Sequence, residues 1–182
     1  MQKGELLFIL GGARSGKSTY AEKLAEKISK DYNKAVIYIA TFPACDDPEM
    51  IERIKRHKDC RTSEWKTLEL ETIDEIIQTI NENKLKNSVI IIECLTILVS
   101  NAMVSKPGDE ILNKIKLLIE FIKNSENIYI IVSNEVGQGI VPENKLARDY
   151  RDILGFANQE FAKNANEVYV IFAGIPVKIK EL

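Results

Sequence analysis

The sequence predicts an α/β fold in which a mostly parallel sheet is covered by helices on both faces. Short apolar runs alternate along the chain with segments that have the three-to-four-residue hydrophobic period of helices. Runs such as Ser88–Ile92 are apolar on both faces, which is typical of a strand buried inside a parallel sheet. With 182 residues, 45% of them hydrophobic, the chain suits one compact domain with a full core.

The order of these segments predicts the topology. Strands are expected at Leu6–Leu10, Ala35–Ala40, Trp65–Leu70, Ser88–Ile92, Asn127–Val132, Glu167–Phe172 and Val177–Lys180. Helices are expected at Lys17–Ser29, Asp47 to about Lys58, Ile73–Asn83, Leu95–Met103, Asp109–Lys123 and Lys145–Asn164. A turn over Ala173-Gly174-Ile175-Pro176 would bring the last strand back as an antiparallel C-terminal edge. Ligands of such sheets bind beyond the carboxyl ends of the strands, so the loops after Leu10, Ala40, Ile92 and Val132 should converge.

The segment GGARSGKS lies between the first strand and the first helix. Gly11, four further residues and then Gly16-Lys17-Ser18 have the spacing of a P-loop, whose backbone N–H groups wrap around a phosphate. The positive end of the following helix dipole points to the same place. Lys17 is expected to reach the β- and γ-phosphates, and the Ser18 hydroxyl to hold Mg²⁺. The sequence therefore predicts a P-loop NTPase fold that binds a nucleoside triphosphate.

Composition excludes several other classes of protein. The net charge of −2 gives no indication of a nucleic-acid surface, and no apolar run is long enough to predict a membrane span. A strand so close to the N-terminus is expected to leave no room for a signal peptide. Cys45, Cys60 and Cys94 form no CxxC pair, so we expect a reducing cytoplasm with no disulfide framework and no zinc site.

Polar residues follow the buried strands at the expected ligand edge. Val89–Ile92 followed by Glu93 has the form of a Walker B strand, whose carboxylate binds hydrated Mg²⁺ or polarises an attacking hydroxyl. Asn134-Glu135 ends the next strand. These two residues are interpreted either as ligand contacts or as an ordinary polar start of a loop. Arg148 and Arg151 fit a solvated helix face with ion pairs. The alternative interpretation is that one arginine of this helix reaches a phosphate.

The single histidine, His57, is a candidate nucleophile. It shares one helical stripe with Met50, Ile54 and Arg61, and nearby Arg53 and Arg56 favour its neutral form at pH 7. A neutral imidazole is a competent nucleophile toward an activated phosphate. The pattern alone favours a different interpretation, a histidine packed at the edge of a helix–sheet contact.

Taken together, the motifs resemble a known family, the bifunctional adenosylcobinamide kinase/adenosylcobinamide-phosphate guanylyltransferases of cobalamin biosynthesis. The matching blocks run along the whole chain in the order of the family. They are GGARSGKS, YIAT at Tyr38–Thr41, DPEMIERIKRHKDCR at Asp47–Arg61, W-x-T-x-E at Trp65–Glu69, ECLTILVSN at Glu93–Asn101, SNEVGQGIVPENKLARDYRDILGFANQ at Ser133–Gln159 and AGIPVKIK at Ala173–Lys180. The third and sixth blocks are not found in generic P-loop kinases.

The resemblance implies two reactions in one domain with a RecA-like core. ATP or GTP phosphorylates the hydroxyl of the aminopropanol arm of adenosylcobinamide, and GMP then moves from GTP onto that phosphate through a guanylylated histidine, which corresponds to His57. Lys17 and Glu93 are the other implied catalytic residues, Ser18 and Glu93 the implied Mg²⁺ ligands. The implied nucleotide contacts are Gly11, Gly12, Ala13, Arg14, Ser15, Gly16, Lys17, Ser18, Ala40, Thr41, Phe42, Lys58, Asp59, Cys60, Arg61, Glu69 and Glu93. The resemblance also implies a homo-oligomer, a trimer, whose substrate is a corrinoid.

Two other classes of protein remain as alternatives. The first is a plain P-loop kinase of small metabolites in which His57 is structural, and formation of a covalent nucleotide adduct would distinguish it. The second is a RecA-like ATPase that binds DNA, which would need basic stripes and stacking aromatics. The negative net charge and the 7% aromatic content argue against the second.

Overall fold

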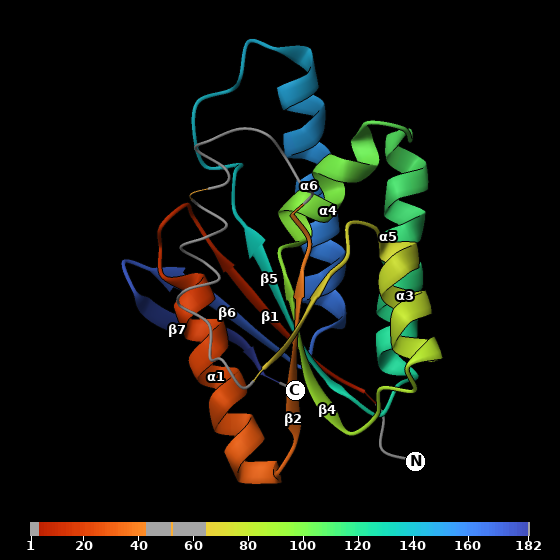
Figure 1. Cartoon of the computed structure of the whole chain (residues 1–182). Helices are drawn as coiled ribbons and strands as arrows, with labels where there is room; N and C mark the ends of the chain where they lie inside the picture. The colour runs from red at the N-terminus through yellow and green to blue at the C-terminus, as the bar shows by residue number, and fades with distance from the viewer. Residues whose placement is uncertain (1–3, 43–51, 53–64, 182) are drawn as a thin grey trace.

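A computed structural model describes residues 4–42, 52 and 65–181 of the chain. Within them, a seven-stranded sheet has the order β3-β2-β4-β5-β1-β6-β7 (Figure 1). Its strands are β1 (Glu5–Gly11), β2 (Ala35–Ala40), β3 (Lys66–Glu69), β4 (Ser88–Glu93), β5 (Ile128–Asn134), β6 (Glu167–Phe172) and β7 (Ile175–Glu181). All neighbouring strands are parallel except β6 and β7, which confirms the predicted α/β fold with an antiparallel C-terminal edge.

Helices cover both faces of this sheet, as expected. They are α1 (Lys17–Tyr32), α3 (Ile73–Glu82), α4 (Leu95–Met103), α5 (Gly108–Lys123) and α6 (Lys145–Asn164). Figure 1 shows α1 on one side of the sheet and α3, α4, α5 and α6 on the other. In the described part of the chain, no helix is both long and apolar enough to cross a membrane.

Strand β4 illustrates why these runs form central strands. Its residues Val89 and Ile91 pack into the core beneath α1, whereas Ile90 and Ile92 pack into the larger core on the opposite face, and all four are fully buried. A strand with apolar side chains on both faces is stable only where helices cover both. In the larger core, Phe8 of β1 stacks on Phe161 of α6 with 5.5 Å between the ring centroids.

Several predicted boundaries differ from those observed. Glu93 and Asn134 are the last residues of β4 and β5 instead of loop residues, because each still pairs with a neighbouring strand. The predicted four-residue turn is wrong in its second half: the turn is Ala173-Gly174, both with positive φ, and Ile175 and Pro176 already pair with β6. The helix predicted from Asp47 lies outside the described residues, apart from the helical Glu52.

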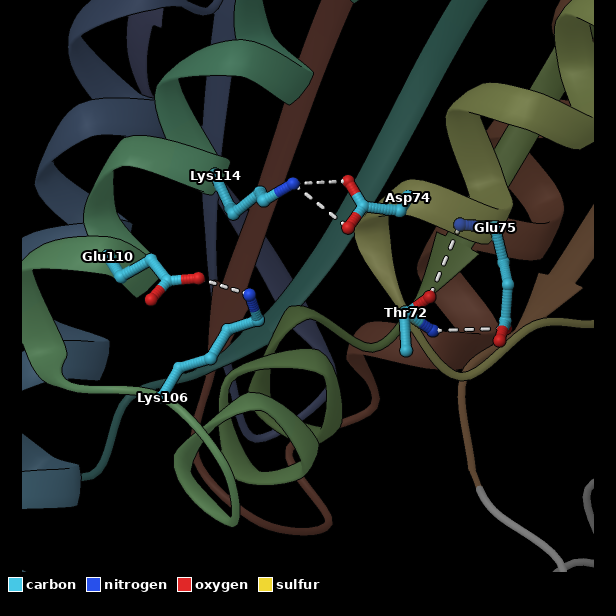
Figure 2. Close-up of polar contacts among 6 residues, drawn as sticks. All are labelled: Thr72, Asp74, Glu75, Lys106, Glu110 and Lys114. Atoms are coloured by element: carbon cyan, nitrogen blue, oxygen red, sulfur yellow. Dashed lines mark hydrogen bonds and ion pairs between the residues drawn. The ribbon is translucent and has the colours of Figure 1, made fainter.

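Helix α3 begins with a capping box (Figure 2). The Glu75 N–H donates to Thr72 Oγ1 at 3.2 Å, and the Thr72 N–H donates to Glu75 Oε2 at 3.3 Å. These two bonds satisfy backbone donors that have no partner within a helix. In the same turn, Lys114 of α5 donates to Asp74 Oδ1 at 2.6 Å and so connects the two helices.

We expect Thr72→Ala to lower the free energy of unfolding by about 1 kcal/mol, because the helix loses a side-chain cap. For a chain of this length, that corresponds to a decrease of about 2–4 °C in Tm, measurable by calorimetry or circular dichroism. Thr79→Ala, in the middle of the same helix, is the matched control and should not lower Tm, because alanine favours helices more than threonine does. Equal losses in both variants would contradict the role of the cap.

Candidate nucleotide-binding site

The P-loop connects β1 to α1 with the geometry that anion binding requires. Gly16 has φ +94°, a left-handed conformation that side chains rarely adopt, and α1 begins at the next residue. No acidic residue lies in the first turn of α1, and no described side chain caps its N-terminus. The first N–H groups and the positive end of the helix dipole are therefore open to a phosphate.

The turn between β6 and β7 packs against the P-loop and supports it. The Gly174 N–H donates to the Ser15 carbonyl oxygen at 2.7 Å. A Cβ on Gly16 would lie 3.2 Å from the Gly174 Cα, so the two glycines allow a close approach of the two backbones. The C-terminal block AGIP thus belongs to the P-loop structurally, a role that the sequence analysis missed.

Lys17 lies inside the loop, and only 9% of its surface is exposed. Its Nζ donates to the Gly12 carbonyl oxygen at 3.2 Å, which holds the ammonium across the loop. This is the position from which a lysine can meet the terminal phosphates of a nucleotide.

A carboxylate from the neighbouring strand reaches the start of α1. Ser18 Oγ donates to Glu93 Oε1, and Tyr38 OH on β2 donates to Glu93 Oε2 at 2.6 Å. Both carboxylate oxygens therefore have a hydrogen-bond donor. The predicted juxtaposition of Ser18 and Glu93 is present, whereas the role of Tyr38 was not foreseen from its strand pattern.

The chemistry of these donors fits Mg²⁺. Mg²⁺ prefers oxygen ligands and is usually held by one or two protein groups together with substrate phosphates and water. Ser18 and Glu93 supply a hydroxyl and a carboxylate side by side. Elsewhere in the described ranges, no group of three histidine, cysteine or acidic side chains could hold a metal ion by itself. Ser18 and Glu93 are therefore the residues that would hold Mg²⁺ beside a bound nucleotide.

The end of β2 is fastened to β4 through Thr41, which is fully buried. The Cys94 N–H donates to Thr41 Oγ1 at 2.7 Å, and the same hydroxyl donates to the Cys94 carbonyl at 3.0 Å. Asn101 of α4 donates to the carbonyls of both Thr41 and Glu71, at 3.2 and 3.0 Å. Burial raises the pKa of the Cys94 thiol, so this group stays neutral and is a poor nucleophile at pH 7.

Asn134 ends β5 beside Gly11 of β1. Its N–H donates to Thr96 Oγ1 at 2.9 Å, and its carbonyl accepts from Asn158 at 3.1 Å. Its side-chain oxygen is buried and has no hydrogen-bond partner among the described residues; the same is true of Ser15 Oγ. Two polar atoms without partners lie at the P-loop edge, which favours ligand contact for Asn134 over an ordinary loop start.

The other polar candidates bond to their own loops. Glu135 Oε1 accepts from the Gly137 N–H at 2.6 Å, and Arg148 donates to the Pro142 and Glu143 carbonyls at 2.9 and 2.6 Å. Arg151 lies 3.5 Å from Asp152. These contacts favour the structural interpretation of the two arginines over phosphate contact.

Ala40 pairs with Glu93 on one side and with Glu69 on the other, so all three lie in one row at the carboxyl edge. Phe42 follows this row and is partly buried. The remaining predicted contacts, His57, Lys58, Asp59, Cys60 and Arg61, lie outside the described residues. The loops after β1, β2, β4 and β5 do converge, as the hydrogen bonds of Glu93, Thr41 and Glu135 with the other strands demonstrate.

Fold and site together define a nucleotide-binding protein of the P-loop NTPase class. Residues 7–179 match the family described as cobinamide kinase / cobinamide phosphate guanyltransferase, and the chain belongs to this family. It is 40% identical over 190 residues to the bifunctional adenosylcobalamin biosynthesis protein CobU of Escherichia coli (96% of this chain, 99% of the relative). The protein of the same name from Salmonella typhimurium is 38% identical over 189 residues, with the same coverage. The bifunctional adenosylcobalamin biosynthesis protein CobP of Pseudomonas aeruginosa is 34% identical over 172 residues (94% and 95%).

We expect Gly16→Ala to weaken ATP binding about tenfold. A left-handed conformation costs a residue with a Cβ about 1–2 kcal/mol, and the added methyl group also meets Gly174. Equilibrium titration with Mg²⁺·ATP measures the affinity, and a thermal melt checks folding. Gly155→Ala is the control, because a Cβ there meets open space in a helix. Unchanged affinity in Gly16→Ala would contradict the importance of the loop conformation.

Proposed function

We propose that this chain phosphorylates the hydroxyl of the aminopropanol arm of adenosylcobinamide with ATP or GTP, and then transfers GMP from GTP to the new phosphate. The observation that carries the proposal is the meeting of Lys17, Ser18 and Glu93 at an open helix N-terminus. The family match over residues 7–179 supports the choice of substrate.

In the first reaction, the substrate hydroxyl attacks the γ-phosphorus and the nucleoside diphosphate leaves. The P-loop N–H groups and Lys17 hold the β- and γ-phosphate oxygens and stabilise the charge that develops on them. When bound, Mg²⁺ would neutralise part of the charge on the phosphates. Ser18 and Glu93 are oriented to hold it, and Tyr38 holds Glu93.

In the second reaction, we propose that an imidazole nitrogen of His57 attacks the α-phosphorus of GTP and pyrophosphate leaves. The phosphate of adenosylcobinamide phosphate then attacks the same phosphorus, the P–N bond breaks and the histidine is released. Splitting the transfer in this way replaces one difficult displacement with two easier ones. Ala40, Thr41, Phe42, Lys58, Asp59, Cys60, Arg61 and Glu69 are the further proposed contacts of the nucleotide.

The proposal extends to the setting of the enzyme. We propose that one domain carries both reactions and that the protein works in the cytoplasm as a homotrimer. Support for self-association comes from the C-terminal edge, where Phe172, Ile175, Val177 and Ile179 are 44–66% exposed. An edge strand with exposed apolar side chains favours contact with another surface.

Lys17→Ala should reduce phosphorylation of cobinamide about 10²- to 10³-fold, because the variant lacks the cation that stabilises charge on the transferred phosphoryl group. Transfer from γ-labelled ATP measures the rate. Lys23→Ala is the matched control, since Lys23 is an exposed lysine of the same helix. A Lys17→Ala variant that works at nearly the wild-type rate would contradict the assignment of the P-loop.

His57→Ala should abolish covalent labelling by α-labelled GTP while phosphorylation of cobinamide continues. The γ-phosphorus reaction needs Lys17 but not the imidazole, so cobinamide phosphate should accumulate. The wild-type adduct is expected to be labile in acid and stable in alkali, because protonation makes the ring nitrogen a better leaving group. Mass spectrometry of the intact protein and the isolated product measures both effects.

The outcomes of this experiment separate the alternatives. Labelling that persists in His57→Ala would mean that another residue is the nucleophile. A wild-type protein that phosphorylates cobinamide but never becomes labelled would support a plain P-loop kinase in which His57 is structural.

A further inference from the structure

We propose that Tyr38 is a positioning residue for Glu93, which keeps one carboxylate oxygen occupied so that the other faces Ser18 and the Mg²⁺ position. This inference rests on the proposed phosphoryl transfer and deepens it. Tyr38 would touch neither substrate nor metal and would act through Glu93.

The contact is direct, and the tyrosine that makes it is almost completely shielded from water. Only 1% of the Tyr38 surface is exposed, and its OH lies 2.6 Å from Glu93 Oε2. Ser18 uses the other oxygen, Oε1. The carboxylate is therefore held between a fixed phenol on one side and the first turn of α1 on the other.

The register of the sheet explains how the phenol reaches the carboxylate. Tyr38 pairs with Ile91, two residue pairs before the place where Ala40 pairs with Glu93, so the two rows lie on the same face of the sheet. Tyr38, Ala40 and Ile91 belong to the same core beneath α1. Because the residue opposite Glu93 is an alanine, its small side chain leaves room for the long phenol from the row below.

A glutamate at this position needs such an anchor more than an aspartate would. Its additional rotatable bond gives it more conformations, and ordering them costs conformational entropy. The hydrogen bond from Tyr38 restricts these conformations and offsets part of that cost. Without the phenol, the Glu93 carboxylate would lose its fixed direction toward Ser18.

Tyr38→Phe tests this role because it removes only the hydroxyl. We expect the apparent affinity for Mg²⁺, measured as the Mg²⁺ concentration that half-maximally promotes ATP binding, to fall about tenfold. The affinity for ATP without Mg²⁺ should stay unchanged, because the P-loop is intact. In the kinase assay, the Mg²⁺ concentration for half-maximal rate should rise by a similar factor.

Two further variants make the test specific. Tyr129→Phe removes the hydroxyl of another fully buried tyrosine, on β5, whose OH meets Asn127 at 3.5 Å, and it should leave the Mg²⁺ dependence unchanged. Adding Tyr38→Phe to Glu93→Gln should have little further effect on Mg²⁺ affinity, because the phenol acts through the carboxylate.

A purely structural tyrosine would give a different result. In that case Tyr38→Phe would lower Tm without changing the Mg²⁺ dependence. Alternatively, it would weaken Mg²⁺ binding by the same factor in the wild-type protein and in the Glu93→Gln variant. Either result would overturn the inference. The proposed function fails separately, if the wild-type protein does not phosphorylate cobinamide, because the binding experiment needs only ATP and Mg²⁺.

Discussion

The uncapped N-terminus of α1 is the feature on which the rest of the site depends. A buried strand must turn within a few residues into a helix whose first N–H groups point to one place, and Arg14 and Gly16 adopt positive φ to make that turn. Such a loop is not stable in isolation, because its backbone conformations are strained and its donors lack helical partners. Neighbouring loops at this edge hold it. Glu135, directly after β5, donates its N–H to the Gly11 carbonyl, and the β6–β7 turn donates to the Ser15 carbonyl.

Buried polar side chains lie at the ends of the strands and not within the two cores. The two cores are aliphatic and aromatic, whereas the buried Thr41, Thr96, Ser133 and Asn158 belong to the carboxyl edge of the sheet and the buried Ser88 and Asn127 to the opposite edge. Each has a hydrogen-bond partner there, as in the 2.7 Å bond from Ser133 to Asn158. Leaving a buried polar atom unpaired costs about 1–3 kcal/mol, so this network keeps the loops in place at little cost. The two described atoms that are left unpaired, on Ser15 and Asn134, both border the P-loop, where a bound ligand would be their neighbour.

Sequence patterns were sufficient for the fold and for the centre of the site, and the reason is local chemistry. The P-loop spacing, the apolar run before Glu93 and the helical periods each depend on a few adjacent residues. The contacts that the sequence did not reveal join residues far apart in the chain: Tyr38 with Glu93, Thr41 with Cys94, Ser15 with Gly174. They depend on strand register and sheet order, which no single segment encodes. The error in the turn at Ile175-Pro176 also comes from sheet order. A proline fits into β7 only because β7 is an edge strand, and its position in the sheet is not visible in the local sequence.

The described edge supports the proposal that the second reaction takes its nucleophile from elsewhere in the chain. Of the described groups at this edge, Ser18 is bonded to Glu93, Lys17 to the loop, and burial keeps the Cys94 thiol protonated by raising its pKa. None of these three is a free neutral nucleophile for the α-phosphorus. The single histidine, His57, follows the Thr41 anchor in the sequence and lies outside the described residues. In the proposed function, the described edge would bind the phosphates and His57 would supply the nucleophile, so that one nucleotide site could serve attack at two different phosphorus atoms.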